Sequence, residues 1–212
     1  TSLLISGREG TVCVDLSCNI AAVVEADVDA VILTHEHIDH VYALPSLLHQ
    51  LWILGRTRAL TIYVPRGMEH LPEALIDVFK IRSKKGIFDI NVSSQSDFCA
   101  GTIDIATLKT DHTDTSLCVI AGEDDDKLVY TCDTRPIRSV PDAMQGAKVL
   151  IHEASGRETD EETLVKKGHS SSADAARLAK ELGVERLFLC HLPMGAERKE
   201  LLLTEARAIF PP

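Results

Sequence analysis

The residues best suited to chemistry form one short run, Thr34-His35-Glu36-His37-Ile38-Asp39-His40. Two histidines spaced two positions apart in an extended chain point to the same side, so His35 and His37 can reach one metal ion. Asp39 and His40 follow where the chain turns into the next helix, and they can reach a second ion. Burying so many polar groups together is costly unless metal ions or polar partners satisfy them. The run therefore predicts a metal centre rather than a histidine-rich polar loop.

Four polar residues, one of them in the run above, come at or just after the end of a strand-like run. They are His35, His112, Asp133 and His191. The ends of strands are where α/β proteins gather the residues that bind ligands. Each of these residues alone fits a buried polar or capping role, but together with the first run they indicate a single centre.

Short strand-like runs alternate with helical patterns along the chain. Strands are expected at 2–6, 11–15, 30–34, 61–64, 88–92, 102–108, 116–121, 127–131, 148–152 and 186–190. Apolar residues at helical spacing predict helices at 44–54, 69–80, 172–182 and 197–208. Ser172 is expected to cap the third of these helices and Gly183 to end it. The pattern predicts one mixed α/β domain over residues 1–212.

Composition narrows the classes of protein and the classes of partner. The net charge of −10 disfavours a broad nucleic-acid-binding surface. No apolar run is long enough to cross a membrane, and no signal peptide is visible, although a leader lost ahead of Thr1 stays open. Six scattered cysteines favour a reducing, cytoplasmic setting, with a Cys13–Cys18 disulfide as the alternative.

The motif HxHxDH resembles the metal-binding loop of the metallo-β-lactamase superfamily. The resemblance implies an αββα sandwich with its metal site on the rim between two sheets. It also implies two divalent ions, most simply Zn²⁺, with Mn²⁺ or Fe²⁺ as alternatives. One ion would take His35, His37 and His112, the other would take Asp39, His40 and His191, and Asp133 and a water or hydroxide would bridge them.

Three later stretches resemble ribonuclease Z, the tRNA 3′-processing endonuclease, and its small-molecule phosphodiesterase relatives. They are Asp133-Thr134-Arg135-Pro136, His152-Glu153-Ala154-Ser155 and Gly168-His169-Ser170. This resemblance implies that His169 faces the scissile phosphate and stabilises the transition state or protonates the departing oxygen. Glu153 would orient a site histidine, and Asp39 would accept the proton of the nucleophile. A solvent-exposed role for His169 and purely structural roles for Glu153 and His152 stay open.

The sequence also departs from that branch. The tRNA-binding arm of the family is inserted between the residues matching His112 and Asp133, and here that interval has room for only one hairpin. Cys132 stands where the family commonly has glycine, and the family's glycine-rich first strand is missing or truncated ahead of Thr1. Lys166 and Lys167 are the nearest cations to His169 in sequence and are candidates for contacting an anionic substrate.

These observations predict a metal-dependent hydrolase that cleaves a phosphodiester, acting on a small or non-tRNA substrate or an RNA end. A tRNA 3′-endonuclease is the first alternative, and a sulfate-ester or lactone hydrolase on the same metals is the second. A metal-binding sensor module is the alternative outside the enzymes. No membrane partner is expected, and a homodimer follows only from family analogy.

Overall fold

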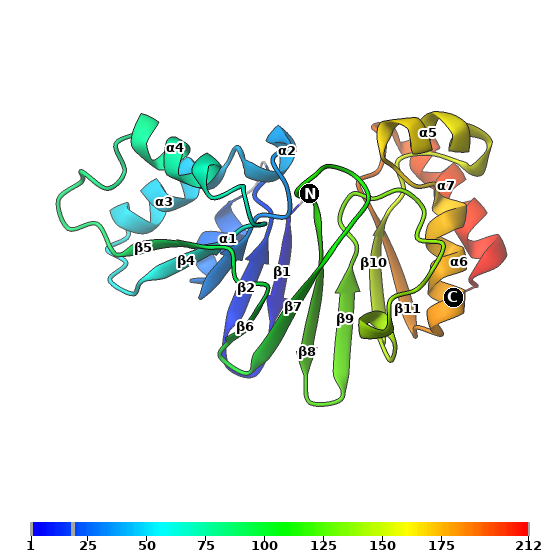
Figure 1. Cartoon of the computed structure of the whole chain (residues 1–212), viewed down its shortest axis with the longest axis horizontal. Coiled ribbons are helices and arrows are strands. Elements are labelled where there is room, and N and C mark those ends of the chain that lie inside the picture. The colour runs from blue at the N-terminus through cyan, green and yellow to red at the C-terminus, as the bar shows by residue number, and fades with distance from the viewer. Residues whose placement is uncertain (1, 18–19, 212) are drawn as a thin grey trace. The chain divides into compact units, whose positions relative to one another are not determined.

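The computed structural model describes residues 2–17 and 20–211. The chain divides into two compact units, Thr1–Ile105 and Ala106–Pro212, and the boundary falls inside strand β7 (Ile103–Lys109). Figure 1 shows the order of the elements along the chain. The expectation of a single domain stays a prediction, and each unit is described by itself.

The first unit is built on a five-stranded sheet of order β1-β2-β3-β4-β5. The strands are β1 (Leu3–Ser6), β2 (Thr11–Val14), β3 (Ala30–Ile32), β4 (Leu60–Tyr63) and β5 (Ile90–Ser93). Only β1 and β2 pair antiparallel; every later neighbour is parallel. The carboxyl ends of β2, β3 and β4 therefore lie at one edge, and the HxHxDH run begins just beyond β3.

Four helices connect these strands: α1 (Ala21–Glu25), α2 (Ile38–Val41), α3 (Leu44–Ile53) and α4 (His70–Val78). Leu47 and Leu48 of α3 are fully buried and pack in one cluster with Val31 and Ile62 of the sheet. This cluster holds the helix that follows the metal-binding run against the strand that precedes it.

The second sheet has the order β11-β10-β9-β8-β7-β6. Its strands are β6 (Asp97–Ala100), β7, β8 (Leu117–Glu123), β9 (Asp126–Tyr130), β10 (Val149–Glu153) and β11 (Arg186–Cys190). Strands β8 and β9 form a hairpin, and β10 lies parallel to both β9 and β11. The hairpin is the only regular structure between β7 and the residues around Asp133, which confirms that this interval holds no long arm.

Helices α5 (Glu161–Lys167), α6 (Ser172–Leu182) and α7 (Ala196–Ile209) belong to the second unit. Leu178 and Leu182 of α6 pack with Leu150 of β10 and Val129 of β9 in one buried cluster. In Figure 1, α6 and α7 run beside β10 and β11. Two sheets with helices in each unit give the element content of an αββα fold.

The ends of α6 show how local chemistry sets a helix boundary. The cap is Ser171, not Ser172, because the Ser171 hydroxyl accepts the backbone N–H of Asp174 and the Asp174 carboxylate accepts the N–H of Ser171. Two adjacent serines offer the same chemistry, and the reciprocal bond with Asp174 selects the first. At the other end Gly183 has φ of 65°, as expected for a glycine that ends a helix.

The expected strands and helices are present with shifts of at most two residues at their ends, and α6 and β11 have the expected ends. The sequence analysis did not identify α1, α2, α5 and β6, which are short elements. Within the described residues, no helix is long and apolar enough to cross a membrane. Among the described residues, Cys13, Cys99, Cys118, Cys132 and Cys190 form no disulfide. The alternative Cys13–Cys18 disulfide involves Cys18, which lies outside the described residues.

Candidate metal centre

The first unit supplies donor atoms in two pairs. The Nε2 atom of His35 lies 3.1 Å from Nδ1 of His37, and the Nε2 atom of His40 lies 3.3 Å from Oδ2 of Asp39. Ligands held about 2.0–2.1 Å from a tetrahedral zinc ion are about 3.3 Å from one another. Each pair therefore has the spacing of two ligands on one ion, as the sequence predicts.

Asp15 fixes both buried histidines of that unit. Its Oδ2 accepts a hydrogen bond of 2.7 Å from Nδ1 of His40 and one of 2.9 Å from the Thr34 hydroxyl, and its Oδ1 accepts the Thr34 N–H at 2.8 Å. Because the Thr34 hydrogen points to Asp15, Nδ1–H of His35 donates to Thr34 Oγ1 at 3.1 Å. Both imidazoles are thus held with Nε2 available to a metal ion.

Sequence analysis missed Asp15 as a site residue. It lies just beyond β2 with φ of 59°, a backbone region that non-glycine residues rarely adopt, and it is completely buried. A charged residue that ends an apolar strand is the signal that could have identified it. Its partners in the HxHxDH run are set by the pairing of β2 with β3, which the sequence alone does not give.

In the second unit, two imidazoles converge on one carboxylate. Oδ2 of Asp133 lies 3.2 Å from Nε2 of His191 and 3.7 Å from Nε2 of His112. The side chains of Asp133 and His112 are almost fully buried, while that of His191 is 24% exposed. One carboxylate between two histidines is the arrangement expected of a ligand shared by two ions.

The other ring nitrogen of each histidine is also held. Nδ1–H of His112 donates to the carbonyl of Gly168 at 2.8 Å. Nδ1–H of His191 donates to the Ser155 hydroxyl at 2.9 Å, and that hydroxyl donates to Oε2 of Glu153 at 2.7 Å. These contacts leave both Nε2 atoms as donors to a metal, the tautomer that metal-binding histidines adopt. Neither Ser155 nor Gly168 was expected to orient a ligand.

His169 lies among these ligands. Its ring centroid is 4.8 Å from that of His112 and 5.1 Å from that of His191. Its Nδ1–H donates to both carboxylate oxygens of Glu153, at 3.0 and 3.1 Å, so Nε2 faces away from Glu153. One donor atom from each of Asp133, His169 and His191 falls within 4.8 Å of the others. The structure therefore places His169 beside the candidate ligands, not in open solvent.

Glu153 is a buried acceptor for several donors. It takes the Thr134 N–H at 2.6 Å besides the bonds from Ser155 and His169. Burial alone would raise its pKa, but the hydrogen bonds and the charge of His169 outweigh burial and hold the pKa below its usual 4.5. Glu153 is therefore a buried, ionised carboxylate that orients His169 directly and His191 through Ser155.

A pH dependence of stability follows from the lowered pKa of Glu153. The ionised carboxylate stabilises the fold at pH values above its ordinary pKa, and this contribution is lost as the pH falls through the lower folded-state pKa. In chelated protein, the unfolding free energy of Glu153→Gln should fall less steeply than that of wild type between about pH 5 and pH 3. Urea unfolding across this range measures it. Exposed Glu162→Gln should keep the wild-type slope, and parallel curves for Glu153→Gln and wild type would contradict the assignment.

Gly168 combines an unusual backbone with a close contact to a ligand. Its φ is 86°, and a Cβ there would lie 2.6 Å from Nδ1 of His112. Gly168→Ala should therefore displace His112 and lower metal affinity by about 10- to 100-fold. Gly146→Ala is the matched control, since Gly146 has φ of 75° and its Cβ would meet nothing within 4 Å.

Both alanine variants should lose about 1–2 kcal/mol of unfolding free energy from backbone strain. Only Gly168→Ala should lose metal affinity, as read by competition with a chromogenic chelator. Equal metal affinity in the two variants would show that the Gly168 contact does not position His112.

Three other residues that the sequence analysis named are characterised by their burial, conformation and hydrogen bonds. His152 is fully buried, burial lowers its pKa, and its Nδ1–H donates to the Glu153 carbonyl at 2.7 Å. Cys132 is buried with φ of 55°, a conformation that explains why glycine suits this position. Lys166 pairs with Glu162 at 2.7 Å, which engages one of the two expected substrate cations.

The described donors fit divalent metal ions. Imidazole nitrogens and carboxylate oxygens suit zinc, and also manganese or iron. In the first unit each pair of donors has the spacing of two ligands on one ion, and in the second unit two imidazoles lie near one carboxylate. Hydrogen bonds at Nδ1 leave Nε2 available in His35, His40, His112 and His191. The assignment of these ligands to particular ions belongs to the proposed function.

Comparison with known proteins identifies the family of the chain. The family model described as β-lactamase superfamily domain matches residues 18–192, which is most of the chain. The chain belongs to the metallo-β-lactamase superfamily. Two relatives within this superfamily are ribonuclease Z from Methanothermobacter thermautotrophicus, 26% identical over 91% of this chain and 78% of the relative, and ribonuclease BN from Enterobacter sp., 28% identical over 86% and 77%. They place the chain in the ribonuclease Z-like branch of the superfamily.

Solved structures confirm the metallo-β-lactamase fold. The metallo-β-lactamase fold protein YhfI from Bacillus subtilis matches with a TM-score of 0.78 and 27% identity, over 99% of this chain and 85% of that one. The human short-form tRNase Z matches with a TM-score of 0.74 over 92% of this chain and 86% of that one, and at 17% identity it shows the fold alone. The expected fold class and the expected enzyme class, a metal-dependent hydrolase, are confirmed.

Proposed function

We propose that this metallo-β-lactamase superfamily member hydrolyses a phosphodiester bond in a small or non-tRNA substrate. The observation that carries the proposal is the placement of His169 beside His112 and His191, with Nδ1 held by the ionised Glu153. A lactone hydrolase has no need of a second, oriented imidazole to protonate a poor leaving group, whereas a phosphodiesterase does.

In this proposal the ligands divide between two divalent ions, most simply Zn²⁺. His35, His37 and His112 hold the first, Asp39, His40 and His191 hold the second, and Asp133 serves both. Such a pair of ions, when bound, makes hydroxide available near neutral pH and stabilises charge on phosphoryl oxygens. Asp15, Gly168 and Ser155 keep the ligating nitrogens in place.

Two side chains handle the protons. Asp39 is a ligand with about half of its side chain exposed, at 52%, so its second oxygen can accept the proton of the attacking water. The imidazolium form of His169 donates its Nε2 proton to the departing oxygen and becomes neutral, and Glu153 stabilises the imidazolium before this transfer. The imidazole then takes a proton back from solvent, because an unperturbed histidine titrates near neutrality.

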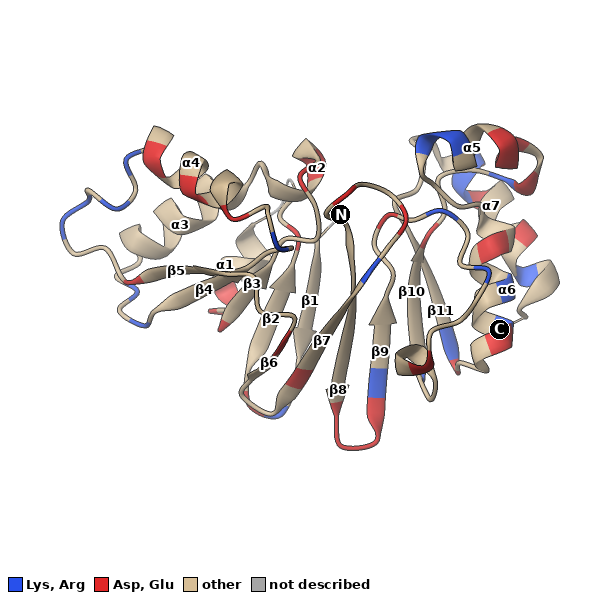
Figure 2. Cartoon of the chain, in the orientation of Figure 1, with Lys and Arg blue, Asp and Glu red and all other residues tan. Residues whose placement is uncertain are grey.

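A small substrate is favoured over tRNA for two reasons. Only the β8–β9 hairpin separates β7 from the segment of Asp133, where the family's tRNA-binding arm is inserted. The net charge is −10, and Figure 2 shows Lys and Arg interspersed with Asp and Glu along α5, α6 and α7. A broad basic surface for RNA phosphates is therefore not formed by these helices. A cytoplasmic setting and a homodimer remain parts of the proposal.

The deciding experiment is hydrolysis of bis(p-nitrophenyl) phosphate, with metal content measured on the same sample and a chelated control. We expect chelator-sensitive turnover with about two metal ions per chain. No turnover by protein that holds both ions would sink the proposal. Precursor tRNA, aryl sulfate and lactone substrates tested in parallel then distinguish the tRNA 3′-endonuclease from the other hydrolases.

A further inference from the structure

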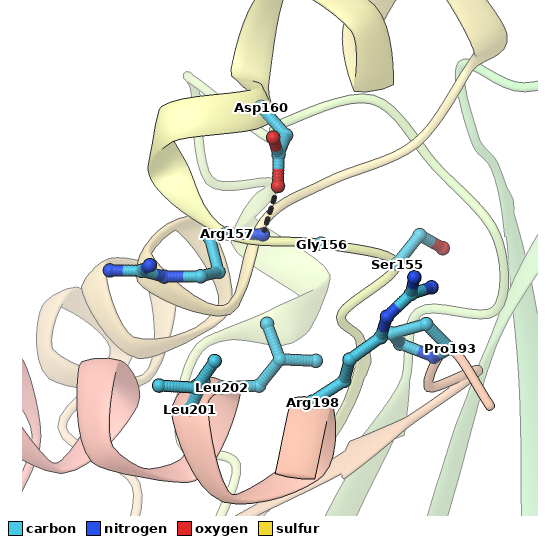
Figure 3. A pocket seen from close by; sticks show the side chains of 8 residues that line it. All are labelled: Ser155, Gly156, Arg157, Asp160, Pro193, Arg198, Leu201 and Leu202. Atoms are coloured by element: carbon cyan, nitrogen blue, oxygen red, sulfur yellow. Dashed lines mark hydrogen bonds between the residues drawn. The ribbon is translucent and has the colours of Figure 1, made fainter. Parts of the chain in front are cut away.

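A cavity of about 390 Å³ opens in the second unit, next to the candidate ligands. It is lined by Ser155, Gly156, Arg157, Asp160, Pro193, Arg198, Leu201 and Leu202 (Figure 3). Ser155 is the residue whose hydroxyl accepts Nδ1–H of His191, and Pro193 follows that histidine by two positions. The cavity thus begins one side chain away from a proposed metal ligand, and its volume is in the range of small-molecule sites.

The walls of the cavity combine apolar and charged side chains. Leu202 is buried, Leu201 is partly exposed, and both belong to α7. Apolar side chains such as these give a planar or aliphatic group a surface to cover.

The two arginines of the cavity differ in what they already bind. Nε of Arg157 lies 3.6 Å from Oε1 of Glu205, and its backbone N–H donates to Oδ2 of Asp160 at 3.3 Å. Arg198 forms no hydrogen bond or ion pair with any residue that the structure describes. In Figure 3 its guanidinium group points toward Ser155 and Pro193, whereas the Arg157 side chain extends to the other side of Leu202.

Arg198 also lies at a position where a positive charge does not stabilise the helix. It lies in the first turn of α7, where the partial positive charge of the helix disfavours a basic side chain. A guanidinium group in that place, with solvent access and no acidic partner, provides an anion with two parallel donors and a local positive field.

We propose that this cavity binds the non-reacting arm of the substrate and that Arg198 holds a second phosphate on that arm. The inference rests on the proposed function and names its substrate class: a phosphodiester of nucleoside size that carries a further phosphate. The apolar part of the arm lies against Leu201, Leu202 and Pro193. Arg198 is a specificity-determining residue in this scheme, and Lys166 and Lys167 are not needed for it.

Two matched substrates test the proposal. The p-nitrophenyl diester of thymidine 5′-phosphate lacks a second phosphate, and the same diester of thymidine 3′,5′-bisphosphate carries one. Wild type should prefer the second compound in kcat/KM by about tenfold, the effect of one charge-assisted contact at a solvent-accessible site. Arg198→Ala should reduce this ratio to about one, and Arg198→Lys should keep part of it.

Lys199→Ala is the control, because Lys199 has the same charge in the same helical turn and does not line the cavity. It should leave the ratio at the wild-type value. A wild-type ratio near one, or a high ratio that survives in Arg198→Ala, would overturn the proposal, even if both diesters are hydrolysed and the proposed function stands.

A binding measurement distinguishes failure of the anion site at Arg198 from failure of the proposed phosphodiesterase function. Titration calorimetry compares thymidine 3′,5′-bisphosphate with thymidine 5′-monophosphate on wild type and Arg198→Ala. If neither diester is hydrolysed but the bisphosphate binds about tenfold tighter than the monophosphate only when Arg198 is present, the anion site stands and the proposed function fails. Equal affinities in all combinations remove the anion site.

Discussion

Alanine in place of Asp133 is expected to remove bound metal and activity together. The Asp133 carboxylate is the only acidic group among the described donors of the second unit, and two imidazoles converge on it. Its loss should lower metal affinity by more than about 100-fold, the upper end of what the loss of a mere supporting partner costs. Turnover should fall with the metal, by about 10³-fold or more.

The measurement is metal content by mass spectrometry after gel filtration, with phosphodiester hydrolysis on the same fractions. Asp125→Ala, an exposed change in the turn between β8 and β9, is the control and should retain both metal and activity. An Asp133→Ala protein that still turns over substrate with its metals bound would rule out a shared carboxylate ligand.

Replacement of His169 should separate metal binding from catalysis. His169→Ala keeps all seven proposed ligands and the partners of their second nitrogens, so metal content should match that of wild type. Turnover should fall by about 10²- to 10⁴-fold, the usual contribution of a positioned proton donor. The pH–rate profile should lose the limb on which activity declines as the donor becomes deprotonated.

Two further observations complete this test. A substrate with a good leaving group, such as p-nitrophenolate, should be affected less than an alkyl diester, because it needs less proton donation. Since His169 lies within ligand distance of Asp133 and His191, loss of one metal ion from His169→Ala would show instead that it is a ligand.

The regular elements that form the core were predictable because their apolar residues recur at fixed spacing. Strand β11 was predicted with its observed ends, since its continuous apolar run is followed at once by His191. Strand β6, only four residues long, and the five-residue helix α1 were missed because so few residues do not establish a period. The choice of Ser171 over Ser172 as a cap depended on one reciprocal hydrogen bond that spacing cannot resolve.

The metal-binding chemistry was visible for a different reason. The first four candidate ligands are close together in sequence, so they can be recognised as a metal-binding motif without knowledge of the fold. They are His35, His37, Asp39 and His40. The partners that fix the imidazoles are not neighbours: Asp15 reaches His40 across a parallel strand pair, and the Gly168 carbonyl reaches His112 from the end of α5. Contacts of this kind depend on chain folding and leave no local pattern in the sequence.

Arg198 illustrates the same limit for specificity. In sequence it is one of several charges in an amphipathic helix, whereas Lys166 and Lys167 lie nearer to His169 along the chain. Its side chain reaches toward Ser155 because α7 packs against α6, and this packing determines which face of α7 lines the cavity.

The hydrogen bonds to the second ring nitrogens have a consequence for how the protein exchanges metals. Asp15, the Gly168 carbonyl and Ser155 anchor the histidines by contacts within each unit, and both hydrophobic clusters are built without any ligand residue. Ligands that are held in this way do not have to be gathered from an unfolded chain, in contrast to small zinc domains. The stripped protein should therefore retain its near-ultraviolet dichroism, and different divalent ions can be introduced in turn into a single folded preparation.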